Sequence, residues 1–243
     1  MLRTSMKLGT VVRLGTVVKL GTAVLAAGIA VAACGTVQMG AAAVLGNSRI
    51  STATLAAQVS NLNAGYTVYK NRVSLQYPVS QMPQQALSWL VRFQVRDTMA
   101  AQQNITVTAG AVQRALVQID AQVRQGGSGA TLPEIAVANG LPPDLIPDLA
   151  RYQAIQNAVI AQLDGGKLPT RKAAQASLQA TFNTVQCQAS KSLNIKINPQ
   201  FGMLDYSQLS VVAAPPSLSA TAPSATPSAS ASASAKPQLT PPC

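Results

Sequence analysis

The side chains most able to form covalent bonds in this chain are its three cysteines, Cys34, Cys187 and Cys243, and the chain contains no histidine. The lack of histidine excludes Ser-His and Cys-His nucleophilic catalysis, the common zinc sites and an imidazole pH switch. No P-loop, dinucleotide-binding GxGxxG or CxxC motif is present. The sequence therefore predicts a protein that is not an enzyme and that holds no metal and no cofactor.

The seven acidic residues support the same prediction, because they are scattered along the chain. The closest pair in a predicted helix start, Asp144 and Asp148, is four residues apart, where acids complement the helix dipole. That role is favoured over a catalytic carboxylate pair. The acids are Asp97, Asp120, Glu134, Asp144, Asp148, Asp164 and Asp205.

Cys34 follows a segment with the pattern of a secretory signal peptide. Residues 1–33 carry four basic residues and no acid, and the uncharged run of 14 residues from Leu20 to Ala33 is shorter than the roughly 20 that span a bilayer. Val31-Ala32-Ala33-Cys34 resembles the bacterial lipobox, in which the cysteine sulfur carries a diacylglycerol with two acyl chains such as palmitate. The alternative is an ordinary signal peptide with a chance cysteine.

Lipidation of Cys34 predicts a protein held at the extracytoplasmic face of the cell membrane, because two acyl chains form a stable anchor. Residues 34–40 are then a short tether. Four of the 18 basic residues precede Cys34 and all seven acids follow it, so the remainder carries about +7 rather than the +11 of the whole chain. The basic residues are scattered and aromatic residues are few, which argues against nucleic-acid binding.

The elements that position these residues are predicted to be mainly helical. Residues 41–45 form a short buried strand, Ser51 caps a helix that ends near residues 63–65, and residues 66–82 form an irregular connection. Helices follow over about 83–103, from Thr108 to the glycines at 126–129, over 131–139 with a Thr131/Glu134 capping box, from Pro142 to about 163 with Pro147 in its first turn, and from a Thr170 cap to about 190. Residues 193–198 alternate like a strand.

The remaining residues, 213–243, are almost entirely Ala, Pro, Ser and Thr. Such a composition cannot bury a core and predicts a disordered tail, of a kind that is also typical of O-glycosylated segments. The predicted organisation is a signal peptide at 1–33, a tether at 34–40, a helical domain at 41–212 and a disordered tail at 213–243.

The order of these elements resembles the N-terminal chaperone domain of the SurA and PrsA family. The segment from Ala101 to Thr108 is similar to the family's entry into its third helix, and Ile195 to Asp205 is similar to its closing strand, with Gln200 in place of the usual Arg and Leu204 in place of the usual Trp. The resemblance covers about residues 41–208. It implies about six helices, with the N- and C-terminal strands paired in a small two-stranded ribbon.

The family resemblance also implies a groove that holds unfolded or partly folded exported proteins. A parvulin prolyl isomerase domain, present in longer members, has no room here, and its site uses histidines that the chain lacks. The expected groove residues are large apolar or adaptable side chains: Tyr66, Tyr69, Tyr77, Met82, Trp89, Phe93, Met99 and Met203. For each one singly, an ordinary core position is the alternative.

Two cysteines remain once Cys34 is lipidated, and an exported pair favours a disulfide. On a helical wheel Cys187 points away from the face that carries Leu178, Phe182 and Val185, and can reach Cys243 at the end of the tail. The sequence equally allows an unpaired Cys187 on a second packing face and a free thiol at Cys243.

The sequence thus predicts a membrane-anchored, extracytoplasmic lipoprotein that resembles a chaperone or foldase and lacks prolyl isomerase activity. The alternative is a scaffold protein of the cell envelope that uses the same helices to dock one specific protein partner.

Overall fold

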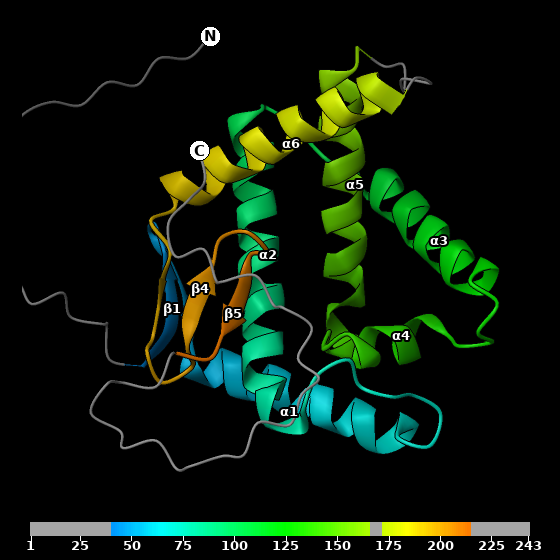
Figure 1. Cartoon of the computed structure of the whole chain (residues 1–243), viewed down its shortest axis with the longest axis vertical. Coiled ribbons are helices and arrows are strands. Elements are labelled where there is room, and N and C mark those ends of the chain that lie inside the picture. The colour runs from blue at the N-terminus through cyan, green and yellow to red at the C-terminus, as the bar shows by residue number, and fades with distance from the viewer. Residues whose placement is uncertain (1–39, 166–171, 215–243) are drawn as a thin grey trace, which may run out of the picture. The chain divides into compact units, whose positions relative to one another are not determined.

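The computed structural model describes residues 40–165 and 172–214 and is mainly helical, which confirms the predicted fold class (Figure 1). All of these residues belong to one compact unit. The predicted signal peptide, Cys34, the Thr170 cap and all but the first two residues of the predicted tail lie outside the described residues. In chain order the helices are α1 (Thr52–Tyr69), α2 (Met82–Gln102), α3 (Ala109–Gln125), α4 (Leu132–Ala138), α5 (Ile146–Leu163) and α6 (Lys172–Ser192), with 3₁₀ turns η1 (Val79–Gln81) and η2 (Pro143–Leu145).

The N- and C-terminal strands pair as predicted. Strand β1 (Ala41–Leu45) runs antiparallel to β3 (Lys196–Ile197), with Ala43 opposite Ile197. A third strand, β2 (Ser48–Ser51), pairs with the other edge of β1, so the sheet has the order β2-β1-β3 rather than the two strands expected. The glycine turn after residue 45 makes this possible, because it folds the chain back as a hairpin.

A second small sheet was not predicted. Strands β4 (Met203–Asp205) and β5 (Ser210–Val212) form an antiparallel hairpin, with Leu204 opposite Val211. Each strand has only three residues, which is too short for an alternating pattern to stand out in the sequence. The hairpin packs on α2, which also contacts α1, α5 and α6 and is therefore the central helix of the fold (Figure 1).

The starts of α1, α3 and α4 follow the capping residues of the sequence. The side chains of Ser51 and Thr108 accept hydrogen bonds from the first turns of α1 and α3. Glu134 Oε2 accepts from the Thr131 backbone N–H at 2.7 Å, which confirms the predicted capping box of α4. Pro147 lies in the first turn of α5 as expected.

The end of the first helix was predicted wrongly. Gly65 was interpreted as part of a helix stop, but α1 continues to Tyr69, and η1 lies in the connection that was expected to be irregular. A Cβ on Gly65 would lie 2.9 Å from side-chain carbons of Val137 and of Pro143. The glycine therefore allows α1 to pack closely on α4 and η2 and does not end the helix.

Candidate functional site

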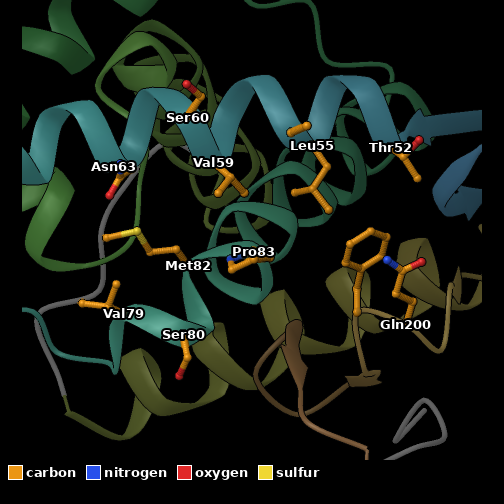
Figure 2. Close-up of a pocket in the computed structure, with 12 residues that line it drawn as sticks. Thr52, Leu55, Val59, Ser60, Asn63, Val79, Ser80, Met82, Pro83 and Gln200 are labelled. Atoms are coloured by element: carbon orange, nitrogen blue, oxygen red, sulfur yellow. The ribbon is translucent and has the colours of Figure 1, made fainter.

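An open apolar groove of about 720 Å³ lies between α1, the start of α2 and the turn that links β3 to β4 (Figure 2). This volume falls within the range of about 300 to 1,000 Å³ that is usual for ligand sites. The groove is lined by Thr52, Leu55, Ala56, Val59, Ser60, Asn63, Val79, Ser80, Met82, Pro83, Gln200 and Phe201.

The first wall is one face of α1, since the lining residues recur every three or four positions from Thr52 to Asn63. Leu55 is buried and joins the main core, whereas Val59 is half-buried and also packs against a second apolar cluster around Leu62. Ser51 fixes where this helix begins, because its Oγ accepts a hydrogen bond from Thr54 N at 2.9 Å. The cap therefore sets which side chains of α1 face the groove.

The second wall is formed by η1 and the first turn of α2. Val79 is 52% exposed, which is high for a large apolar side chain, and it faces the groove together with Met82 and Pro83. Pro83 occupies the first turn of α2, where the missing N–H costs no helix hydrogen bond. Val79 thereby adds exposed apolar surface to this wall of the groove.

The third wall is the turn from Asn198 to Gly202, the segment that carries much of the family resemblance. The Asn198 side chain bonds in two directions, because Nδ2 donates to Ala41 O of β1 at 3.0 Å and Oδ1 accepts from Gln200 N at 3.1 Å. Phe201 N donates to Asn198 O at 2.9 Å. The turn therefore holds Gln200 and Phe201 against the groove while it is tied to the first strand.

Gly202 ends this turn and is required there by space. Its φ is +121°, and a Cβ would lie 2.1 Å from the carbonyl oxygen of Val212 in β5. No side chain fits in that gap without movement of the backbone. The glycine thus brings the third wall of the groove into contact with the β4/β5 hairpin.

The groove contains no ionisable side chain among its lining residues. Its apolar floor is bordered by hydroxyl and amide groups of Thr52, Ser60, Asn63, Ser80 and Gln200. Phosphates and other anions need cationic or oriented N–H partners, and acid–base catalysis needs a titratable group within reach. The groove is therefore suited to an uncharged, largely apolar segment with backbone groups that can bond at the rim.

The ionisable side chains with shifted pKa values lie outside the groove lining. Burial raises the pKa of Tyr77 to about 12, and its hydroxyl donates to Val137 O at 3.1 Å. Burial lowers the pKa of Arg92 and of Arg96. The hydrogen bond from Thr131 N–H, as the largest cause, lowers the pKa of Glu134, whose Oε1 also lies 2.9 Å from Arg72 Nε.

Only Met82 among the eight predicted groove residues lines the groove. Tyr66, Tyr69 and Tyr77 pack with Met82 in the cluster around Leu62, and Trp89 and Phe93 pack partly buried against Leu141 and Leu145. Met99 is fully buried in the main core. Met203 is half-buried on β4, opposite Val212. The prediction rested on side-chain size, but large apolar side chains are also the ones most often buried in a protein core.

Sequence reasoning missed the groove residues on η1 and in the turn. A signal existed for Gln200 and Phe201, which belong to the segment that resembles the family's closing strand. Leu55 and Val59 were recognised only as the apolar face of a helix. Val79 offered no signal, because an isolated valine after a proline is common in loops.

Within residues 40–165 and 172–214, no group of three or more Cys, Asp or Glu side chains could hold a metal ion. None of the helices in the described part is long and apolar enough to cross a bilayer. Comparison of the chain with protein-family models, with curated proteins and with solved structures finds no match.

Proposed function

We propose that this chain is an extracytoplasmic lipoprotein, anchored through Cys34, that binds unfolded or partly folded exported proteins and has no prolyl isomerase activity. The observation that carries the proposal is the open, uncharged groove, whose apolar floor and polar rim match the side chains and the backbone of an extended polypeptide. The pairing of β1 with β3 supports the proposal further, because the SurA and PrsA resemblance implies that pairing.

The size of the groove fits weak and reversible binding. Burial of two large apolar side chains contributes about 3 to 6 kcal/mol. The loss of translational and rotational freedom on association offsets most of this gain, since it costs on the order of 4 kcal/mol or more. Clients with several apolar segments would therefore be held briefly and released without an energy source.

The test measures aggregation of a denatured exported protein, by light scattering, with the chain from residue 34 carrying Cys34→Ser at equimolar ratio. Two variants form a matched pair: Val79→Asp charges the groove, and Val117→Asp charges a similarly exposed valine on α3, the two residues being 52% and 60% exposed. We expect the parent chain and Val117→Asp to at least halve the aggregation rate and Val79→Asp to lose most of this effect.

Equal behaviour of the two variants, or no effect of the parent chain, would contradict the proposal. Crosslinking in isolated membranes then distinguishes the chaperone from the alternative, a scaffold that docks one specific partner. A single stoichiometric partner would favour docking, whereas a range of unfolded clients would favour the chaperone.

A further inference from the structure

The three-stranded sheet turns one face to the core of the protein and the other face away from it. The row of opposed residues that packs in or against the main core cluster consists of Ile50, Ala43 and Ile197. Successive side chains of a strand point to opposite faces of a sheet. The adjacent row, in which Val44 lies opposite both Arg49 and Lys196, therefore belongs to the outer face.

This second row, named here the basic row (Arg49, Val44 and Lys196), carries two charges that are not neutralised. Arg49 and Lys196 are exposed, and Val44 between them is half-buried. Within the described part of the chain, neither basic side chain forms an ion pair. The sequence places no acid near the row, since residues 40–96 and 165–204 contain no Asp or Glu. The outer face of the sheet is therefore a positively charged surface without a counter-charge of its own.

The spacing of the two charges indicates what they can bind. Neighbouring strands lie about 4.8 Å apart, so the backbones of Arg49 and Lys196, one on each side of β1, are separated by about 10 Å. A single phosphate or carboxylate is best held by donors that converge on it. Two separated cations on one face suit a surface that repeats its anionic groups, such as the headgroups of a membrane. Both side chains are long enough to reach such a surface from the sheet.

The position of the sheet in the chain fits the same partner. Strand β1 begins at Ala41, seven residues after Cys34. Seven residues span at most about 25 Å, so a lipid at Cys34 would keep the sheet close to the bilayer. We propose that the basic row rests on the membrane and binds the headgroups of anionic lipids. This inference goes beyond the proposed function and rests on it only for the anchor that brings the sheet to the membrane.

The first experiment measures the basic row without the anchor. It uses the chain from residue 34 carrying Cys34→Ser, and vesicles either of phosphatidylcholine alone or of equal parts of phosphatidylcholine and phosphatidylglycerol. The bound fraction is measured by flotation at low and at high salt. The double variant Arg49→Gln/Lys196→Gln removes both charges of the row.

A matched double variant, Lys70→Gln/Arg114→Gln, serves as the control. It also removes one exposed lysine and one exposed arginine that form no ion pair within the described residues, but from the end of α1 and from α3. The two double variants have the same net charge, so a difference between them reports the position of the charges. Equal unfolding midpoints in urea verify that all the proteins are folded.

We expect the parent chain to float with the anionic vesicles at low salt and to be released at high salt, because salt screens exposed charges. The partition coefficient should fall about fivefold for each single substitution in the basic row and about 30-fold for the double variant, since one basic residue at an anionic surface contributes about 1 kcal/mol. The control should lose less than about threefold. Equal losses in the two double variants, or equal binding of the parent chain to both kinds of vesicle, would overturn the proposal.

The second experiment tests the orientation of the anchored protein. The full chain is expressed in a bacterium that lipidates exported proteins, purified and reconstituted into the same two kinds of vesicle. Its lysines are acetylated with a water-soluble reagent, and the rates are measured by mass spectrometry. We expect acetylation of Lys196 to be at least threefold slower on anionic than on neutral vesicles, and that of Lys70 to be the same on both. Equal rates at Lys196 on the two kinds of vesicle would overturn the proposal.

Failure of the proposed function gives different results. A chain that does not stay on neutral vesicles would overturn the anchor alone, because the flotation experiment does not need it and then decides the basic row. Loss of client binding would appear in the aggregation assay, in which Arg49→Gln/Lys196→Gln should protect as well as the parent chain, since neither residue lines the groove.

Discussion

Helix α2 serves two different regions of the molecule, the groove at its first turn and a buried joint with the β4/β5 hairpin along its middle. At the groove, Met82 and Pro83 present apolar surface without charge. At the joint, Ser88 Oγ accepts from Val211 N at 2.7 Å, and Arg92 donates from Nε to Leu209 O at 3.1 Å. Polar groups thus fix the hairpin to α2, while the groove is left free of such bonds.

The difference between the joint and the groove indicates how the walls of an open apolar groove are held apart. The third wall of the groove, with Phe201, is connected to the hairpin through Gly202 and to β1 through Asn198. The wall gains its position from the joint and the sheet, and Phe201 also packs against the main core cluster, which includes Leu55. We expect the joint to tolerate change poorly and the groove surface to tolerate it well.

The largest effect on stability is expected for Gly202→Ala. The added Cβ would lie 2.1 Å from Val212 O, so the hairpin must shift, and we expect a loss of more than about 3 kcal/mol in the free energy of unfolding. Gly127→Ala is the control, since Gly127 also has a positive φ of 69° but no atom within 4 Å of an added Cβ. It should cost about 1 kcal/mol. Urea unfolding measures both, and equal losses would show that the contact with Val212 does not matter.

The next largest effect is expected at Arg96, which is 3% exposed. Its guanidinium carbon lies 4.0 Å from the Tyr152 ring centre and 4.8 Å from that of Phe182, Nη2 donates to the Tyr152 hydroxyl, and Nη1 has no hydrogen-bond partner. Arg96→Ala leaves a cavity and should cost about 2 to 4 kcal/mol.

Arg96→Met tests whether the charge of this residue or its bulk matters. An apolar side chain of similar length removes a buried cation that, within the described part of the chain, forms no ion pair with a carboxylate, so we expect a change within about 1 kcal/mol of the parent. Thermal unfolding of both variants provides the measurement. If Arg96→Met cost as much as Arg96→Ala, the cation–ring contacts would outweigh desolvation.

A smaller effect is expected for Ser88→Ala, which tests the joint directly. The substitution leaves the buried Val211 N–H without its acceptor and should cost about 1 to 3 kcal/mol. Ser190→Ala is a matched control, because Ser190 is equally buried but its Oγ only donates to Gln186 O within its own helix. We expect that control to change stability by less than about 0.5 kcal/mol. Similar losses in both variants would contradict the role of Ser88 in holding the hairpin.

The sequence predicted the parts of the fold that depend on local signals. Ser51, Thr108 and the Thr131/Glu134 pair marked helix starts because capping is a contact between near neighbours in the chain. Gly65 and Gly202 looked alike as glycines. Their roles differ because each one touches a distant segment, Val137 and Pro143 in one case and Val212 in the other, and such contacts leave no local pattern.

The groove was harder to predict because it, too, depends on contacts between segments that are distant in the chain. Its walls come from three segments that are separate in the chain, and its surface consists of medium-sized side chains such as Val59, Val79 and Pro83. The large aromatic residues that suggested a binding surface instead pack in the cluster around Leu62 and against Leu141 and Leu145. At the latter site Trp89 packs on Phe93 with ring centres 5.8 Å apart. Side-chain size predicts burial better than it predicts contact with a client.

The smallest effect on stability, and the sharpest test of the groove, is expected for Ala56→Trp. Ala56 is exposed on α1 and lines the groove, whereas Ala57 is exposed on the same helix and does not line it. Both substitutions to Trp should cost about 0.5 kcal/mol through helix propensity, so their unfolding midpoints should agree.

The two variants should nevertheless differ in client binding, because an indole at position 56 fills the groove and one at position 57 leaves it open. In the aggregation assay Ala56→Trp should lose most of the protective effect and Ala57→Trp should retain it. If Ala57→Trp lost as much as Ala56→Trp, clients would bind elsewhere on α1. If both retained full protection, the groove would not be the binding surface, and the contrast between an open groove and a closed joint would describe only how the fold is stabilised.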